Sequence, residues 1–335
     1  MILIDALYIN SGGGKELLDI LVDRLKEKNV HFLIDQRLLN NYNIEPKNVT
    51  YLKANIFNRH FFYLKHRLTF SFVFCFANIP PTIKLNCFVV TYFHNVLLLN
   101  TIHNFNLFTF LKQKFIHFFE KNTDRWFVQS QVVKNELILN SFNLNKIDIY
   151  PFFDDRKSVV NSKNTPTDIL SFLYVSSGEP HKNHILLLEA FEKYSLTYPN
   201  NILKITIDNK YVDLLSFVKK KALHNVINLG FIQKDKIINE YTKADVIIFP
   251  SLRESFGLGL IEAAQLELPI IASDLNYVHE VVIPSCVFDP YNSENLFSIL
   301  LNHKLYITKP SKLIVNNKLN ELIFLILSYS NNTTK

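Results

Sequence analysis

Two glutamates that lie eight positions apart, Glu254 and Glu262, flank a pair of glycines in the segment SLRESFGLGLIEAAQLELPIIASD. Glycine is scarce in this chain, with 7 among 335 residues, so each one indicates a special backbone requirement. A carboxylate accepts hydrogen bonds, and it can take two from the vicinal hydroxyls of a sugar such as ribose. The spacing therefore favours a polar ligand site, with a capped helix and a solvated glutamate as the purely structural alternative.

The neighbouring residues place these glutamates beyond the end of a buried strand. The run DVIIFPS (residues 245–251) is typical of such a strand, and the helical segment GLIEAAQLE follows after a short loop. In an open parallel sheet, ligands bind outside the carboxyl ends of the strands. The N–H groups and partial positive charge at the start of the helix suit a phosphate, and Gly257 and Gly259 would let it approach the backbone.

Apolar runs alternate with amphipathic segments along the chain, which predicts an α/β fold with two doubly wound sheets. The first domain is expected over residues 1–153 and the second over residues 168–312. A polar segment without apolar periodicity, residues 154–167, is the expected linker. Residues 313–335 are expected to form a C-terminal helix and tail that covers either domain.

The expected strands are short apolar runs, at residues 2–9, 30–35, 70–76, 87–94, 125–130 and 146–153 of the first domain and 171–177, 203–208, 226–232, 245–251 and 269–274 of the second. Gly12, Gly13 and Gly14 follow the first run and precede a helix. A strand, a glycine turn and a helix in this order are the usual start of a doubly wound sheet.

The positive charge is concentrated in the first domain. The chain carries a net charge of +6, and no Asp or Glu occurs between Pro46 and Phe119, while eight Lys or Arg do. Part of this stretch, FNRHFFYLKHRLTF (residues 57–70), mixes bases with aromatics, which predicts docking on an anionic membrane surface. A basic solvated face over an ordinary core is the alternative. No nucleic-acid-binding motif accompanies the charge, so nucleic acid is not an expected partner. The aromatics of residues 105–119 are expected in the core and at interfaces.

The three cysteines, Cys75, Cys87 and Cys286, match no metal-ligand spacing and cannot all pair, which predicts a reducing compartment. Met1 leads into an apolar run without the basic segment of a secretory signal. The most apolar window, residues 68–79, is shorter than the roughly 20 residues that span a bilayer. We therefore expect a cytoplasmic protein, with peripheral attachment to the inner face of the cytoplasmic membrane if the basic stretch docks there.

The pattern P-S-x-x-E-S-F-G-L-x-x-x-E-A, from Pro250 to Ala263, resembles the signature of family-four retaining glycosyltransferases of the GT-B type (glycosyl transferases group 1). The similarity is strong over residues 172–290 and weaker over residues 1–150. It implies two Rossmann-like domains facing a central cleft and a UDP- or GDP-sugar donor held mainly by the second domain. It also implies transfer with retention of the anomeric configuration, without a required metal or other cofactor.

The resemblance also assigns roles to single residues. Glu262 matches the glutamate that binds the donor ribose, Glu254 the one that contacts the transferred sugar, and Lys182 the phosphate-binding lysine. His94 ends an expected strand and matches the family's active-site histidine, so the predicted catalytic residues are His94, Lys182 and Glu254. The predicted donor-binding set adds Gly12, Gly13, Gly14, Ser177, Phe231, Ile232, Phe256, Gly257, Leu258 and Glu262.

One position departs from the family's pattern. The family usually has an arginine five residues before the phosphate-binding lysine, and this chain has Ser177 there. The departing diphosphate carries negative charge that a cation stabilises, so the missing arginine leaves the clamp one charge short. His181 or a basic residue of the first domain are the expected substitutes.

These features predict a hexosyltransferase of the mannosyl or glucosyl type. The resemblance and the basic first domain favour a glycan or lipid-linked acceptor in bacterial surface polysaccharide assembly, either lipopolysaccharide O-antigen or capsule. A soluble acceptor, as in sucrose-phosphate or glycogen synthases, fits the basic first domain and the short chain less well. The alternative from another class is a non-catalytic nucleotide-sugar-binding subunit of a polysaccharide assembly complex, which the serine at position 177 supports.

Overall fold

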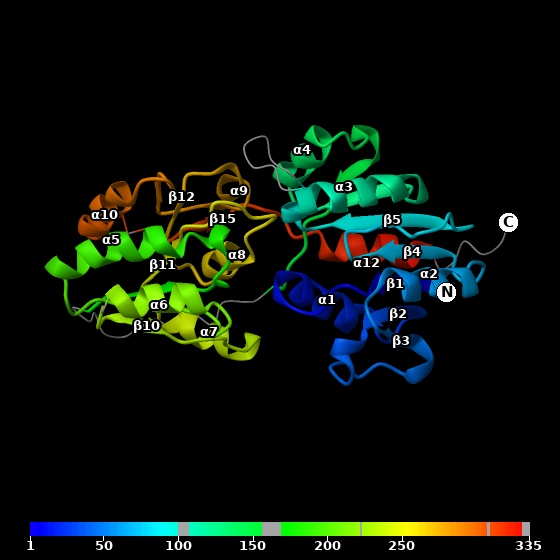
Figure 1. Ribbon diagram of the computed structural model, residues 1–335, viewed down its shortest axis with the longest axis horizontal. Helices are drawn as coiled ribbons and strands as arrows, with labels where there is room; N and C mark the ends of the chain where they lie inside the picture. Colours follow the sequence, from blue (N-terminus) through cyan, green and yellow to red (C-terminus); the bar gives the residue numbers. More distant parts are fainter. Residues whose placement is uncertain (100–106, 156–168, 222, 307–308, 330–335) are drawn as a thin grey trace. The chain divides into compact units, whose positions relative to one another are not determined.

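A computed structural model describes residues 1–99, 107–155, 169–221, 223–306 and 309–329 of the chain. The chain divides into two compact units, which Figure 1 shows in sequence colours. The first unit combines Met1–Asp155 with Asn316–Lys335, and the second comprises Arg156–Val315. Most of the expected linker, from residue 156 to residue 167, lies outside the described residues.

The first unit is built on one parallel sheet of seven strands in the order β3-β2-β1-β4-β5-β6-β7. Its strands are β1 (Ile2–Ala6), β2 (Val30–Asp35), β3 (Val49–Leu52), β4 (Phe72–Cys75), β5 (Phe88–Phe93), β6 (Arg125–Val128) and β7 (Ile147–Ile149). Every residue of the central strands β1 and β4 is buried. Burial on both faces of the sheet explains why these strands read as almost continuous apolar runs.

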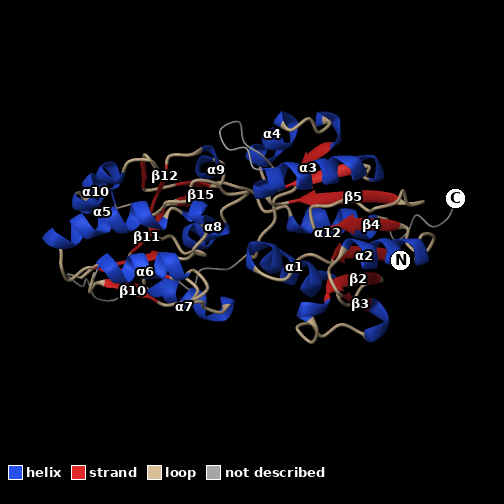
Figure 2. Ribbon diagram, in the orientation of Figure 1, coloured by secondary structure: helices blue, strands red, loops and turns tan. Residues whose placement is uncertain are grey.

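Helices cover both faces of this sheet (Figure 2): α1 (Gly12–Leu25), α2 (Ile56–Lys65), α3 (Leu107–Phe119), α4 (Gln131–Leu139) and α12 (Leu319–Ser328). The connections through α2 and α3 run in one direction across the sheet, so right-handed crossovers place both helices on the same face. The packing agrees with this rule. Phe62 of α2 shares a core cluster with Val89, and Ile116 of α3 shares one with Phe93. Val89 and Phe93 are four residues apart on β5 and therefore point to the same side.

The last helix, α12, completes the first unit. The backbone N–H of Lys318, just before this helix, donates a hydrogen bond to the Pro151 carbonyl over 2.8 Å. Tyr329, just after it, stacks on Phe72 of β4 and Phe88 of β5, with ring centroids 4.5 and 5.2 Å away. The C-terminal helix thus covers the sheet of the first unit, a choice that the sequence left open.

A buried ion pair joins α2 to the centre of the first sheet. Arg59 Nε donates to Asp5 Oδ2 over 2.7 Å, and neither side chain is exposed to solvent. Arg59 also donates to the carbonyls of Ile79 and Pro80 over 2.8 and 2.7 Å. It therefore fixes the loop between β4 and β5, and one of the eight bases of the acid-free stretch belongs to the core instead of the surface.

The second unit contains one parallel sheet of six strands in the order β10-β9-β8-β11-β12-β14. These strands are β8 (Ser171–Tyr174), β9 (Ile202–Ile205), β10 (Val226–Asn228), β11 (Val246–Phe249), β12 (Ile270–Ser273) and β14 (Cys286–Phe288). The helices are α5 (His184–Thr197), α6 (Val212–Lys221), α7 (Lys234–Lys243), α8 (Leu258–Gln265), α9 (Asn276–His279), α10 (Ser293–Leu301) and α11 (His303–Tyr306). A small antiparallel pair joins β13 (Val282–Ile283) to β15 (Lys312–Leu313).

Two doubly wound parallel sheets confirm the predicted α/β fold class. The sequence missed the strands β3 and β14 and the helix α2. Of the expected strands, β2 has its expected bounds, and the others are present but shorter. Of the aromatics of residues 105–119, expected in the core and at interfaces, Phe108 and Phe118 are exposed on the outer face of α3, and Phe105 lies outside the described residues. Among the described helices, none has both the length and the apolar character needed to cross a membrane.

Candidate functional site

The predicted residues of the second unit lie on two loops that leave neighbouring strands. One loop, residues 175–183, follows β8 and includes the short 3-10 helix Pro180–Lys182. The other, residues 250–257, follows β11, which pairs directly with β8. The chain continues from β8 to one side of the sheet and from β11 to the other. Such a switch point opens a crevice at the carboxyl ends of the strands, where ligands of doubly wound sheets bind.

Lys182 and Glu254 meet at this switch point. Lys182 Nζ lies 2.5 Å from Glu254 Oε1, which makes a charge-assisted hydrogen bond between the two loops. The side chains are 17% and 13% exposed, so the pair is largely shielded while part of each group still reaches solvent. The lysine can therefore contact an anion directly, without an intervening water layer. The carboxylate can still accept a hydrogen bond from a hydroxyl group.

Hydrogen bonds between the loops hold this pair in place. The Tyr174 hydroxyl donates to the Lys182 carbonyl and lies within hydrogen-bond distance of Ser251 Oγ, both over 2.9 Å. The backbone N–H of Leu252 donates to the His181 carbonyl over 2.7 Å. Tyr174 and Ser251 are fully buried, so the base of the site is rigid and its polar atoms are paired.

Helix α8 begins directly beside the pair. Gly257 precedes it with a φ of 75°, a left-handed conformation that disfavours side chains, and this N-cap residue has no side chain to cap the first turn. A glycine is needed at position 259 for a different reason from the one expected. A Cβ there would lie 3.1 Å from Phe249 and 3.2 Å from the Tyr241 hydroxyl, so this glycine lets α8 pack against β11 and α7. The expectation that Gly259 opens the backbone to a ligand is therefore wrong.

The remaining donor-site residues of the second unit fall into two groups. Phe256 is buried just before α8, while Glu262 is partly exposed one turn after Leu258 and shares its side of the helix. Phe231 and Ile232 follow β10, which β9 and β8 separate from β11. The structure thus brings the α8 residues close to the Glu254 loop and places Phe231 and Ile232 toward the far edge of the sheet.

Ser177 lies in the loop after β8, where the sequence lacks the expected arginine. Its carbonyl is 2.9 Å from Nε2 of His184, which donates a hydrogen bond to it. Burial lowers the pKa of His184 to about 4, so the ring is neutral at physiological pH. His184 therefore supports the loop as a hydrogen-bond donor.

The two other bases near this loop differ in charge. Burial, and after it the charge of Lys182, lowers the pKa of His181, so this expected substitute for the arginine is mainly neutral at pH 7. Arg253 lies close enough to contribute to the same lowering. Arg253 is not among the residues predicted from the sequence, although its place directly before Glu254 in a strand-end loop is a usable signal. It supplies a permanent cation beside the site.

In the first unit, Gly12, Gly13 and Gly14 form the start of α1 at the end of β1. Ser11 precedes the helix without a capping side-chain bond, and the first turn has no acidic residue, so its partial positive charge is not offset locally. A Cβ on Gly14 would lie 3.0 Å from His94 Nε2. The glycine turn and the histidine, which follows β5, are thus direct neighbours, as the sequence predicts for residues of one site.

The environment of His94 keeps its ring neutral. Burial lowers the pKa of His94 to about 4, and its ring stacks on Phe76 with centroids 4.9 Å apart. Its backbone N–H donates to Asn78 Oδ1 over 2.7 Å, so the loop fixed by Arg59 also holds the histidine. The buried Nδ1 atom has no hydrogen-bond partner within the described structure. The other ring nitrogen, Nε2, lies 3.4 Å from Asn78 Nδ2, and the neutral ring is poorly suited to act as a cation.

The structure brings the predicted residues together in two clusters, one in each unit. Lys182, Glu254 and the start of α8 form the cluster of the second unit. Gly14 and His94 form that of the first. Within the described ranges, no group of three His, Cys, Asp or Glu side chains is arranged to hold a metal ion.

Comparison with known proteins relates the chain to sugar-transferring enzymes. Residues 155–300 match the family described as Glycosyl transferases group 1. The serotype-specific mannosyltransferase WbdA of Escherichia coli is 34% identical over 117 residues, which cover 33% of this chain and 14% of that protein. The O-antigen chain mannosyltransferase RfbU of Salmonella typhimurium is 30% identical over 123 residues, covering 35% and 33%. The chain thus spans a third or less of the length of these relatives.

Solved structures share the fold over nearly the whole chain. Anabaena Alr3699/HepE, solved in complex with UDP and glucose, has a TM-score of 0.70 at 17% identity, over 92% of this chain and 91% of that one. A glycosyltransferase from Rickettsia africae has a TM-score of 0.66 at 17% identity, over 99% of both chains. Residues 155–300 thus resemble the glycosyl transferases group 1 family, and the chain shares the α/β fold of GT-B glycosyltransferase structures, with two Rossmann-like units.

Proposed function

We propose that this protein is a retaining glycosyltransferase that moves a sugar from a nucleotide-sugar donor to a glycan or a lipid-linked acceptor. The pairing of Lys182 with Glu254 at the switch point of the second sheet carries this proposal. The pair combines a cation for a diphosphate with an acceptor for sugar hydroxyls, and it lies inside the segment that matches the family.

The donor would lie along the loops of the second unit. Its diphosphate fits between Lys182 and the start of α8, which follows a glycine and where N–H groups and the helix dipole attract an anion. Glu262, one turn into α8, would accept hydrogen bonds from the ribose hydroxyls, and Glu254 from the transferred sugar. Each carboxylate thereby acts as a hydrogen-bond acceptor.

The charges of the site suit departure of a nucleoside diphosphate. As the glycosidic bond breaks, negative charge grows on the leaving phosphate, and Lys182 with Arg253 would stabilise it. The leaving phosphate would take the acceptor proton on the same face of the sugar, which retains the anomeric configuration. Glu254 is engaged by Lys182, which fits a binding role better than that of a nucleophile. With these cations in place, we propose a reaction that requires neither a metal nor another cofactor.

The relatives guide the choice of substrate. WbdA and RfbU are named mannosyltransferases, and RfbU acts on the O-antigen chain by its name. HepE was solved with UDP and glucose. We therefore propose a mannosyl or glucosyl donor carrying UDP or GDP, and a role in O-antigen or capsule assembly. The unpaired cysteines Cys75, Cys87 and Cys286 fit a cytoplasmic location.

Ligand-detected NMR of the full chain with UDP-, GDP-, dTDP- and CMP-sugars tests the donor site. Selective binding of one nucleotide sugar that is weakened in Lys182→Ala supports the proposal. Lys204→Ala is the matched control, because Lys204 forms a similarly shielded ion pair with Glu240 on the same unit, over 3.0 Å. Binding with unchanged affinity in Lys182→Ala, or an equal loss of affinity in the control, contradicts the assignment.

Product formation separates the enzyme from a non-catalytic binding subunit. The donor selected by NMR would be incubated with membranes or glycan acceptors, and release of the nucleoside diphosphate would be measured. Release that depends on both acceptor and Lys182 identifies a transferase. Donor binding without acceptor-dependent release favours the binding subunit.

A further inference from the structure

Helix α2 presents a row of apolar side chains to solvent. Phe57, Phe61, Leu64 and Leu68 are between 48% and 78% exposed, and Leu68 lies just beyond the end of the helix. Their spacing of four, three and four residues puts the helical members on one side of α2. The opposite side is fully used by the core, where Phe62 is buried. The exposed row is therefore not required to fold the sheet.

Helix α3 repeats this arrangement. Phe108, Leu111, Phe115 and Phe118 are between 36% and 68% exposed and follow each other at spacings of three, four and three residues. The only α3 residue in the buried core cluster of the described structure is Ile116. Because α2 and α3 cover the same face of the sheet, both rows look outward from one side of the first unit.

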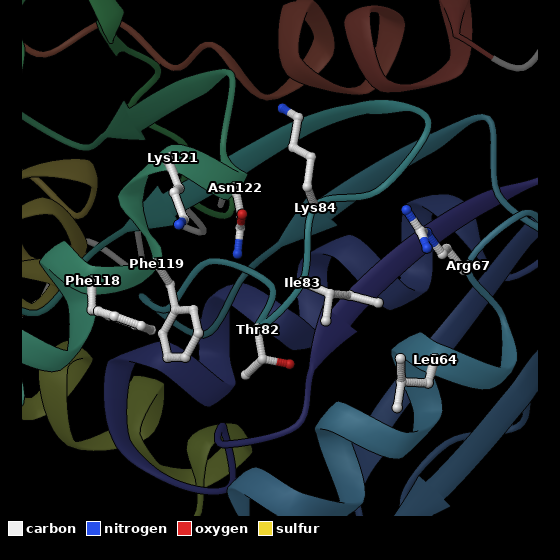
Figure 3. A pocket seen from close by; sticks show the side chains of 9 residues that line it. All are labelled: Leu64, Arg67, Thr82, Ile83, Lys84, Phe118, Phe119, Lys121 and Asn122. Atoms are coloured by element: carbon white, nitrogen blue, oxygen red, sulfur yellow. The ribbon is translucent and has the colours of Figure 1, made fainter.

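A hollow of about 420 Å³ joins the two rows, within the range of about 300–1,000 Å³ usual for ligand pockets. Figure 3 shows its lining, with Leu64 and Arg67 at the end of α2 and Phe118 and Lys121 at the end of α3. The loop between β4 and β5 supplies the remaining side with Thr82, Ile83 and Lys84. The hollow thus combines apolar walls with the cations Arg67 and Lys121 and with Lys84, which is paired with Asp124.

The charge around the rows is almost entirely positive. Lys65, Arg67, Lys112 and Lys114 belong to the acid-free stretch and are exposed. Lys112 Nζ lies 4.2 Å from the ring centre of Phe108, so a cation sits directly beside an exposed aromatic. The nearby acids are already paired. Asp124 binds Lys84 over 3.0 Å, and Glu120 lies 3.2 Å from His117.

We infer that the outer faces of α2 and α3 dock on a bilayer of anionic phospholipids, with the hollow receiving a headgroup phosphate. Phenylalanine and leucine rows enter the interfacial region, while lysine and arginine heads stay at the level of the phosphates. Positive charge without intervening acids complements an anionic leaflet. Binding to a nucleic acid would leave two rows of exposed apolar side chains without an apolar partner. This surface stands independently of the reaction proposed for the second unit.

Flotation of the full chain with vesicles tests the inference. Phosphatidylcholine vesicles with and without phosphatidylglycerol would be compared, at low and high salt. We expect binding only with phosphatidylglycerol, and weaker binding at high salt. Phe57→Ser combined with Phe118→Ser should weaken it about tenfold or more, because binding scales with buried apolar area. Arg67→Gln combined with Lys121→Gln should weaken it about thirtyfold.

Matched control variants lie on the second unit. Leu196→Ser removes another exposed leucine, and Lys219→Gln with Lys220→Gln removes two exposed cations of α6. Far-ultraviolet circular dichroism melting and nucleotide-sugar binding should be unchanged in every variant, so a lost vesicle signal reports docking alone. Binding that is equal with and without phosphatidylglycerol, or equally weakened by the control variants, overturns the inference. Binding of glycerol phosphate but not of vesicles also overturns it, as does a dimer in sedimentation velocity that the Phe57 and Phe118 substitutions abolish.

Discussion

Lys182 and Glu254 are 72 residues apart in sequence, yet their Nζ and Oε1 atoms lie 2.5 Å apart where β8 and β11 end. Two parallel neighbouring strands deliver the loops, and the hydrogen bond between Leu252 and His181 keeps them together. The pair is held ready before any ligand arrives. A bound diphosphate would therefore contact a lysine that Glu254 already holds in position, and not one that has to be ordered from solvent.

Removal of the lysine should therefore affect turnover more than folding. We expect Lys182→Ala to lower kcat by about 10²–10³, the usual effect of removing one group that stabilises transition-state charge. Steady-state kinetics with the NMR-selected donor would measure this, with Lys204→Ala as the control. Equal kcat values in the wild type and Lys182→Ala would exclude a leaving-group role for this lysine.

Glu262 should affect donor binding more than the chemical step. A carboxylate that accepts ribose hydroxyls binds ground state and transition state alike, so Glu262→Ala should raise KM at least tenfold and change kcat little. Titration of the nucleoside diphosphate itself, without the sugar, should show the same loss of affinity. If Glu262→Ala changes kcat at constant KM, the ribose assignment fails.

His184 should make stability depend on pH. Its pKa falls from 6.5 to about 4 on folding, because burial disfavours the charged ring. Below pH 6.5 the unfolded chain binds the proton that the folded chain excludes, so this contribution is present at neutral pH and is lost as the pH falls toward 4. The loss from pH 7 to pH 5 amounts to about 2 kcal/mol.

Urea unfolding at pH 7 and pH 5 measures this loss, if the transition of the second unit is resolved. His184→Gln should be less stable than the wild type at pH 7, and its unfolding free energy should fall less on acidification. Other histidines contribute equally to both proteins, so only the difference counts. If the wild type and His184→Gln lose the same free energy of unfolding between pH 7 and pH 5, His184 does not cause the pH dependence.

The ion pair between Asp5 and Arg59 should be essential for the first unit. Arg59→Met leaves the Asp5 carboxylate buried without its partner, which costs about 3–5 kcal/mol. The loop held through Ile79 and Pro80 would also loosen, and with it the Asn78 contact to His94. Chemical denaturation would give the free energy, and the His94 ring resonances would report the loop. Lys53→Met, an exposed change nearby, should stay within about 0.5 kcal/mol of the wild type.

The sequence allows the sheets to be predicted because their central strands are buried on both faces and read as apolar runs. It also places Lys182 and Glu254 at strand ends, from which the strand-end rule brings them near each other. The edge strand β3 escapes detection because its residues are only half-buried and mixed in type. Helix α2 is missed because aromatic residues occupy both its core side and its exposed side, which erases the helical period.

Other features depend on packing that no local pattern contains. Gly259 looks like a ligand-facing glycine until Phe249 and Tyr241 are seen against it. Arg59 counts as surface charge until Asp5 is placed beside it. The sequence shows a serine at position 177 where the resemblance implies an arginine, but only the packing around His181 shows that its pKa is lowered and that Arg253 lies nearby.

Because α12 packs on the first sheet, the first unit can be completed only after the second unit has been synthesised. The second unit is one continuous segment, whereas the first needs residues from both sides of it. During synthesis, the second unit can fold while Phe72 and Phe88 of the first unit still lack their stacking partner Tyr329. A nascent or truncated chain that stops before residue 316 therefore leaves an apolar patch of the first sheet uncovered, which makes premature termination there an aggregation hazard.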